Sequence, residues 1–96
     1  MDKIQEKYST QAIKYHNMYM YFIKDAISVI SFCKVQGIPI HGVEAFMLSG
    51  RGIQPSSEHS LWFKDIKMSN WEEVIDFLKR KENEEYLYEL WYEGYE

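Results

Sequence analysis

The chain has 96 residues, a length that predicts one compact domain over residues 1–96. Its composition is 46% hydrophobic, 27% charged and 17% aromatic, which excludes a disordered chain because such chains contain few aromatic residues. The formal net charge of −4 argues against general nucleic-acid binding, which needs Lys and Arg clustered against phosphates. We therefore expect no nucleic-acid partner.

The N-terminal segment gives the first expectation about the compartment. Residues 1–22 carry charged and polar side chains throughout, unlike the apolar segment of a secretory signal peptide. The longest stretch with few charges, residues 26–33, is far shorter than the roughly 20 residues that a membrane-spanning helix needs. A single cysteine, Cys33, fits a reducing compartment. The sequence thus predicts a cytoplasmic protein without a membrane partner.

Apolar residues recur at helical spacing through the first third of the chain. Between Ile4 and Cys33 they lie three or four positions apart, close to the repeat of 3.6 residues that is typical of a helix. One unbroken helix would be about 50 Å long, whereas a globule of this length is about 30 Å across, so we expect a break near His16 and Asn17. Whether residues 3–20 form a separate helix stays open. The aromatic residues on this stripe, which we expect in the core, are Tyr8, Tyr15, Tyr19 and Phe22.

The middle of the chain predicts a helix followed by a hairpin. Residues 22–36 form the helix, because Gly37 can cap its C-terminus and Pro39 cannot continue it. Two strands are then predicted, over residues 40–48 and 60–65. The segment between them is rich in turn-forming residues, so we expect a long connection. Those residues are Gly50, Gly52, Pro55, Ser56 and Ser57.

A second helix is predicted over residues 70–81. Ser69 and Glu72 have the spacing of a capping box, in which each side chain bonds to the backbone of the other residue. The apolar residues behind this box share one helical face. They are Trp71, Val74, Ile75 and Leu78.

The tail, residues 84–93, is compatible with a strand or a helix. A strand is favoured, because its aromatic residues suit β structure and alternate with other side chains. The expected order is then helix, strand, strand, helix, strand. We expect an α+β fold, a single two-layer domain with helices packed on one face of a small sheet.

One group of side chains has the composition of a metal or acid-base site: His41, Glu44, Glu58 and His59. Neighbours on a strand that are an odd number of positions apart point to opposite faces, so His41 and Glu44 cannot converge. At most two ligands remain on each face, fewer than a usual zinc site has. We therefore expect no catalytic residues, metal ion or cofactor.

The acidic excess lies at one end of the chain. Residues 1–69 hold eight Lys or Arg against six Asp or Glu, whereas residues 70–96 hold three against nine. Tyr and Trp are common in binding hot spots, and acidic neighbours attract a basic partner. The alternative is that the aromatic residues fill the core while the glutamates only solvate the other face. The predicted partner-binding residues are Glu85, Tyr88, Glu89, Trp91, Tyr92 and Glu93.

The middle of the chain resembles a family of small bacterial proteins. Residues 38–46 read IPIHGVEAF, after residues 24–27 (KDAI) and before residues 54–55 (QP) and 58–62 (EHSLW). This pattern resembles the immunity proteins of bacterial polymorphic-toxin systems, of the immunity protein 40 type, over about residues 24–65. The chain has Gly-Val-Glu where a Gly-Gly-Asp-like step is expected.

The resemblance implies a cytoplasmic protein that binds a cognate toxin domain and blocks it, as a monomer or a weak homo-oligomer. Two alternatives stay open. One is a small metal- or ligand-binding domain, or an enzyme, that uses His41, Glu58 and His59. The other is a non-enzymatic adaptor or oligomerisation module with the aromatic tail as its edge strand.

Overall fold

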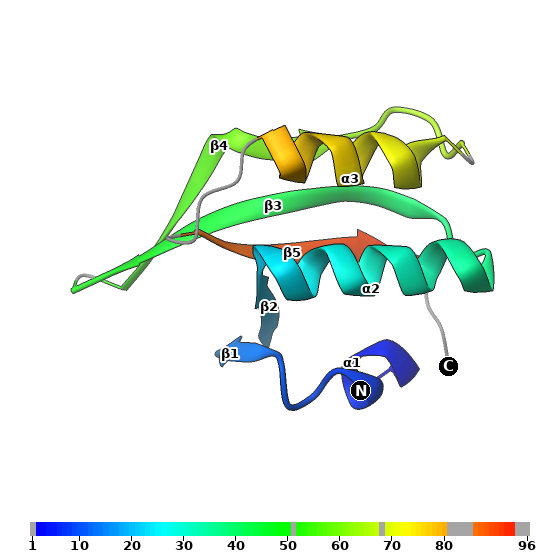
Figure 1. Ribbon diagram of the computed structural model, residues 1–96. Coiled ribbons are helices and arrows are strands. Elements are labelled where there is room, and N and C mark those ends of the chain that lie inside the picture. Colours follow the sequence, from blue (N-terminus) through cyan, green and yellow to red (C-terminus); the bar gives the residue numbers. More distant parts are fainter. Residues whose placement is uncertain (1, 51, 68, 81–85, 94–96) are drawn as a thin grey trace.

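The computed structural model describes residues 2–50, 52–67, 69–80 and 86–93. Its elements in chain order are α1 (Lys3–Lys7), β1 (Ile13–Tyr15), β2 (Met18–Phe22), α2 (Ile23–Gln36), β3 (Ile40–Ser49), β4 (Gly52–Trp62), α3 (Asn70–Arg80) and β5 (Tyr86–Tyr92). The strands form one antiparallel sheet with the order β1-β2-β5-β3-β4. Helices α2 and α3 lie side by side on one face of this sheet (Figure 1). The fold is α+β, as the sequence predicts.

From α2 onward the expected order of helix, strand, strand, helix and strand is confirmed, but the second of the two middle strands covers Gly52–Trp62 and not residues 60–65. Helix α2 ends at Gly37, which has a φ of 70° and caps the helix in the left-handed conformation. Helix α3 begins at Asn70, directly after Ser69, the expected N-cap residue. The tail is a strand, since β5 covers Tyr86–Tyr92. The expected strand over residues 40–48 corresponds to β3.

The helical spacing of the first third does not correspond to a helix between residues 8 and 22, and the open question of a helix over residues 3–20 is answered by the short helix α1 alone. Strands β1 and β2 form a hairpin there, and its turn lies at His16 and Asn17, where a break is expected. His16 has a φ of 55°, which closes the turn. Tyr15 and Tyr19 are half-buried strand residues, and Phe22 is 44% exposed.

The expected long connection between the two middle strands is also wrong. Ser49 pairs with Gly52, so only two residues separate the end of β3 from the start of β4. Val43 pairs with Leu61 and Ala45 pairs with Ser56, which leaves residues 57–60 as a wide bulge in β4. Apart from Gly50, which lies in a turn, the turn-forming residues of this segment therefore lie in a strand at the edge of the sheet, where proline and bulges are tolerated.

The main core lies between the two helices and the sheet. It includes Ile30 and Cys33 from α2, Val74 and Leu78 from α3, and Tyr88 from β5, each fully buried. Burial raises the pKa of the Cys33 thiol to about 12, so this cysteine behaves as a small apolar residue. None of the described helices is both long and apolar enough to cross a membrane.

Two side chains at the start of α3 attach this helix to the first residues of β3. The Asn70 amide, buried in the core, donates hydrogen bonds to the carbonyl oxygens of Ile40 and Asp65, at 3.1 Å each. The indole N–H of Trp71 donates to the carbonyl oxygen of Ile38 at 2.7 Å. These bonds give partners to backbone carbonyl groups in and near the core and hold the start of α3 against the segment that enters β3.

We predict that Asn70→Ala lowers the free energy of unfolding by about 2 kcal/mol, because carbonyl groups in and near the core lose their donor. Urea denaturation measures the change. The control is Ser28→Ala, which removes an exposed hydrogen bond within α2 and should change stability by less than about 0.5 kcal/mol. Equal stabilities for the two variants would contradict the prediction.

Candidate functional site

The candidate site lies on the sheet face opposite α2 and α3. Paired strand residues point to the same face, so the register places Trp62, Gly42 and Trp91 abreast on β4, β3 and β5. The next row on the same face contains Glu44 and Glu89. We call these four side chains, from Trp62, Trp91, Glu44 and Glu89, the tryptophan-glutamate face.

Gly42 allows the two tryptophans to meet across the strand between them. A Cβ atom at this position would lie 2.4 Å from the carbonyl oxygen of Leu61 and 2.8 Å from Cε3 of Trp62. Without it, the rings of Trp62 and Trp91 pack with their centroids 5.5 Å apart at an angle of 52°. Both side chains remain about half exposed, at 51% and 45%. Large aromatic side chains held in this way on a surface are typical of binding sites.

Glu44 and Glu89 are direct cross-strand neighbours of the same charge. Such pairs destabilise a sheet. Burial, and then the charge of Glu44, raise the pKa of the Glu89 carboxyl above its ordinary value, and a hydrogen bond from the Trp91 side chain partly opposes this shift. Folding therefore places two carboxylates where they repel one another.

A shallow hollow of about 330 Å³ adjoins this pair. Its walls come from Glu44 and Trp62, from Pro55 of β4 and from Ser57 and Ser60 of the bulge. The bulge is closed by Ser60, whose hydroxyl accepts from the Ala45 amide and donates to the carbonyl oxygen of Ser56. The serine-rich segment thus shapes one side of the hollow.

The other end of the same sheet face is covered. Met20, Phe46 and Leu87 form a second, smaller core there, with exposed fractions of 0%, 7% and 1%. The β1-β2 hairpin and β4 pack half-buried side chains against it. Among the described residues, the tryptophan-glutamate face is therefore an open part of this side, beside the covered region.

The predicted tail residues divide between surface and core. Glu89 and Trp91 belong to the tryptophan-glutamate face, whereas Tyr88 is fully buried against the helices and is not available to a partner. Tyr92 is half-buried and donates a hydrogen bond to Asp2 at 2.8 Å. Glu85 lies outside the described residues.

Glu93, the last of the predicted residues, lies 3.0 Å from His41 through Oε1 and Nε2. His41 is itself the extra residue at an irregularity between β3 and β5. Sequence reasoning did not include Trp62 or Glu44 among the partner-binding residues. The sequence places both residues in predicted strands, but their alignment with Trp91 and Glu89 depends on which strands are neighbours in the sheet.

The tail strand is not at an edge of the sheet. β5 pairs with β2 on one side and with β3 on the other. The expectation of an edge strand for an oligomerisation module is therefore wrong, because the backbone groups of β5 are used within the sheet.

The histidines do not converge with Glu58. The Nδ1 atom of His59 lies 3.0 Å from the Ser56 hydroxyl, and its ring stacks on Tyr86 with centroids 4.1 Å apart. His41 contacts Glu93 instead. Within the described part of the chain, no three His, Cys, Asp or Glu side chains are grouped so that they could hold a metal ion.

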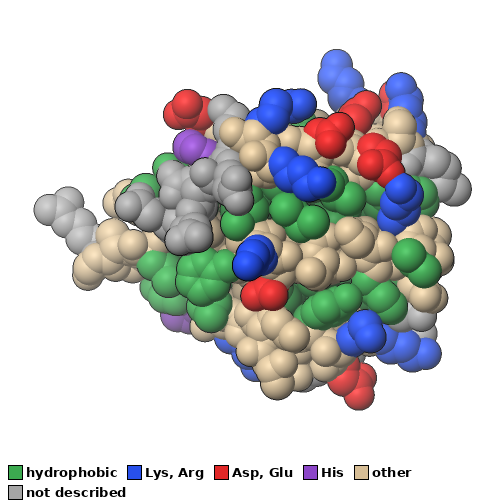
Figure 2. All heavy atoms as spheres, viewed as in Figure 1, with side chains coloured by type: hydrophobic (Ala, Val, Ile, Leu, Met, Phe, Trp, Pro, Cys, Tyr) green, Lys and Arg blue, Asp and Glu red, His purple; other side chains and the backbone are tan. Residues whose placement is uncertain are grey.

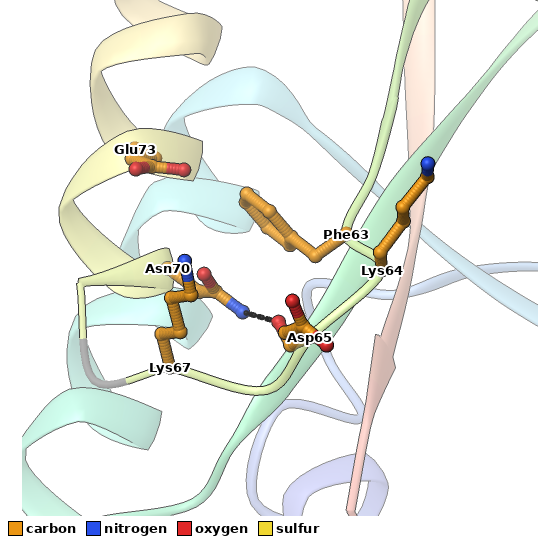
Figure 3. Close-up of a pocket in the computed structure, with 6 residues that line it drawn as sticks. All are labelled: Phe63, Lys64, Asp65, Lys67, Asn70 and Glu73. Carbon is orange, nitrogen blue, oxygen red and sulfur yellow. Dashed lines mark hydrogen bonds between the residues drawn. The ribbon is translucent and has the colours of Figure 1, made fainter.

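A second hollow, of about 180 Å³, lies at the start of α3 (Figure 3). Its lining residues are Phe63, Lys64, Asp65, Lys67, Asn70 and Glu73. Figure 3 shows the Asn70 amide directed at the backbone of Asp65. Because this amide already bonds to two carbonyl groups, we assign the hollow a structural role.

Comparison with family models, with curated proteins and with solved structures gives no match for this chain.

We predict that Gly42→Ala lowers the free energy of unfolding by about 2 kcal/mol and changes tryptophan fluorescence, because the added methyl group overlaps Leu61 and Trp62. Thermal unfolding and emission spectra measure both effects. Gly50→Ala is the control, since a Cβ there meets nothing within 4 Å. A Gly42→Ala protein as stable as the Gly50→Ala protein would contradict this account.

We predict that Glu89→Gln stabilises the protein at neutral pH by about 0.5 kcal/mol, because it removes the like-charged pair. Because the pKa of Glu89 is raised in the folded protein, the folded state still holds a proton at pH values between the ordinary and the raised pKa, where the unfolded state has released it. The free energy of unfolding therefore falls as the pH rises through this interval. The gain should disappear below the ordinary pKa of glutamate. Urea titrations at several pH values measure it, with Asp76→Asn on α3 as the exposed control. A destabilised Glu89→Gln protein at neutral pH would refute the prediction.

Proposed function

We propose that this protein is an immunity protein that binds and neutralises a cognate bacterial toxin domain by protein-protein interaction, without catalysis. The observation that carries the proposal is the pair of half-exposed tryptophans held together above Gly42. Trp is among the residues most enriched at binding hot spots, and an isolated surface does not need two such side chains exposed.

The tryptophan pair has the rigidity that favours binding. Each ring is held against the other and sits on a strand, so little side-chain entropy remains to be lost on association. Trp91 lies on the central strand β5, which is paired on both sides. The surface is therefore organised before a partner arrives.

The segment that resembles immunity proteins contains two of the strands that form the tryptophan-glutamate face. The residues that resemble the immunity protein 40 type, about 24–65, include α2, β3 and β4. Strands β3 and β4 supply Gly42, Glu44 and Trp62. The segment that suggests toxin neutralisation thus supplies half of the face that is suited to binding.

The proposal is tested by growth protection. The toxin domain encoded beside the gene is expressed in bacteria with and without this protein, and we expect the wild-type chain to restore growth. The double variant Trp62→Ala and Trp91→Ala should lose protection, because it removes the contact area of the open face. Co-purification of the toxin with the wild-type chain should be lost in the same variant.

The matched control is Val35→Ser on α2, which removes a side chain that is 80% exposed on the helix side and should protect like the wild type. Thermal unfolding checks that the double variant is folded, and Trp62→Ala alone serves as a milder change. Absence of protection by the wild-type chain, or full protection by a folded double variant, would overturn the proposal.

A further inference from the structure

We infer that the tryptophan-glutamate face receives an arginine side chain from a basic segment of a protein partner, with its guanidinium group against Glu44 and Glu89 and beside the tryptophan rings. This inference rests on the proposed function and specifies the chemistry of the partner.

The first support is the distribution of charge. Strands β2, β3, β4 and β5 contain no Lys or Arg, and their charged residues are Glu44, Glu58 and Glu89. The described Lys and Arg side chains lie on the helices, on β1 and between β4 and α3. On the helix side both signs are interspersed (Figure 2). The open face is thus complementary to a positive partner.

The second support is the unfavourable position of the two carboxylates. They are directly opposed across β3 and β5, and no described Lys or Arg forms an ion pair with either. Two carboxylates offer several acceptor positions, and a guanidinium group can fill them with bidentate hydrogen bonds. A cation at this point would remove the repulsion that the folded chain carries. Binding would therefore use an arrangement that costs the protein stability.

The third support is the neighbouring row. Trp91 lies two residues from Glu89 along β5, a separation of about 7 Å. Trp62 pairs with Gly42, which lies two residues from Glu44 along β3. The faces of tryptophan rings attract cations, and the planar guanidinium stacks on them better than an ammonium group does. The geometry therefore favours arginine over lysine.

The hollow beside Glu44 fits one side chain. Its volume of about 330 Å³ lies at the lower end of the range for small-ligand pockets, about 300–1,000 Å³. Ser57 and Ser60 line its far wall with polar side chains, and Trp62 forms an apolar side. An extended basic segment can thus place one head group here while its backbone remains at the surface.

The experiment titrates the full chain with a short peptide that contains two arginines and with the same peptide containing citrulline, which has nearly the same shape and no charge. Indole N–H resonances report binding and are assigned with Trp62→Phe and Trp91→Phe. Trp71 is an internal control, because its indole is buried and bonded to Ile38. We expect saturable shifts at Trp62 and Trp91 alone, and at least fivefold weaker binding of the citrulline peptide.

Variants test the carboxylates. Glu44→Gln and Glu89→Gln should each weaken binding of the arginine peptide at least threefold, whereas Asp76→Asn, which removes one exposed acidic charge from α3, should leave it unchanged. Equal binding of the two peptides, absence of any shift, or unaltered binding by both glutamine variants would overturn the inference.

The experiments distinguish a failure of the proposed toxin-neutralising function from a failure of the inference about arginine. Protection against the toxin without selective binding of the arginine peptide would leave the proposed function standing and remove the inference about arginine. Selective peptide binding without protection would retain the cation-binding face and remove the toxin-neutralising function.

Discussion

The structure depends on the pairing of β5, the last strand in the chain, between β2 and β3. Without β5, the N-terminal hairpin has no connection to the other half of the sheet. The same strand contributes Tyr88 to the main core and Leu87 to the smaller core on the opposite face. The fold is therefore completed by contacts that are distant in sequence, which makes both layers depend on the C-terminal segment.

The open part of the sheet combines features that do not serve stability. Gly42 is crowded by Leu61 and Trp62 at the centre of the face, Glu44 and Glu89 repel one another, and two tryptophans remain half exposed. The repulsion between the two carboxylates and the exposure of the two indoles do not help folding. Surfaces that keep such features are commonly those on which binding depends.

Much of the fold could be predicted where the spacing of the apolar residues fitted only one kind of secondary structure. The apolar faces of α2 and α3 have helical spacing, and the aromatic content of β5 favours a strand, so these elements were predicted correctly. The helical interpretation of residues 8–22 was wrong because Tyr15 and Tyr19 fit both a helical stripe and a hairpin. The start of β4 was missed because Pro55 and its serines are typical of loops, although an edge strand with a bulge accepts them.

The sequence by itself determined the α+β class, the helices after residue 22 and the aromatic-acidic character of the tail, because these depend on local spacing and composition. Only the tertiary structure decided that Tyr88 is core while Trp91 is surface beside Trp62. Strand order and register are set by packing between distant segments, and they bring Trp62, Gly42 and Trp91 into one row. The candidate site is made by that alignment, which no single segment of the chain contains.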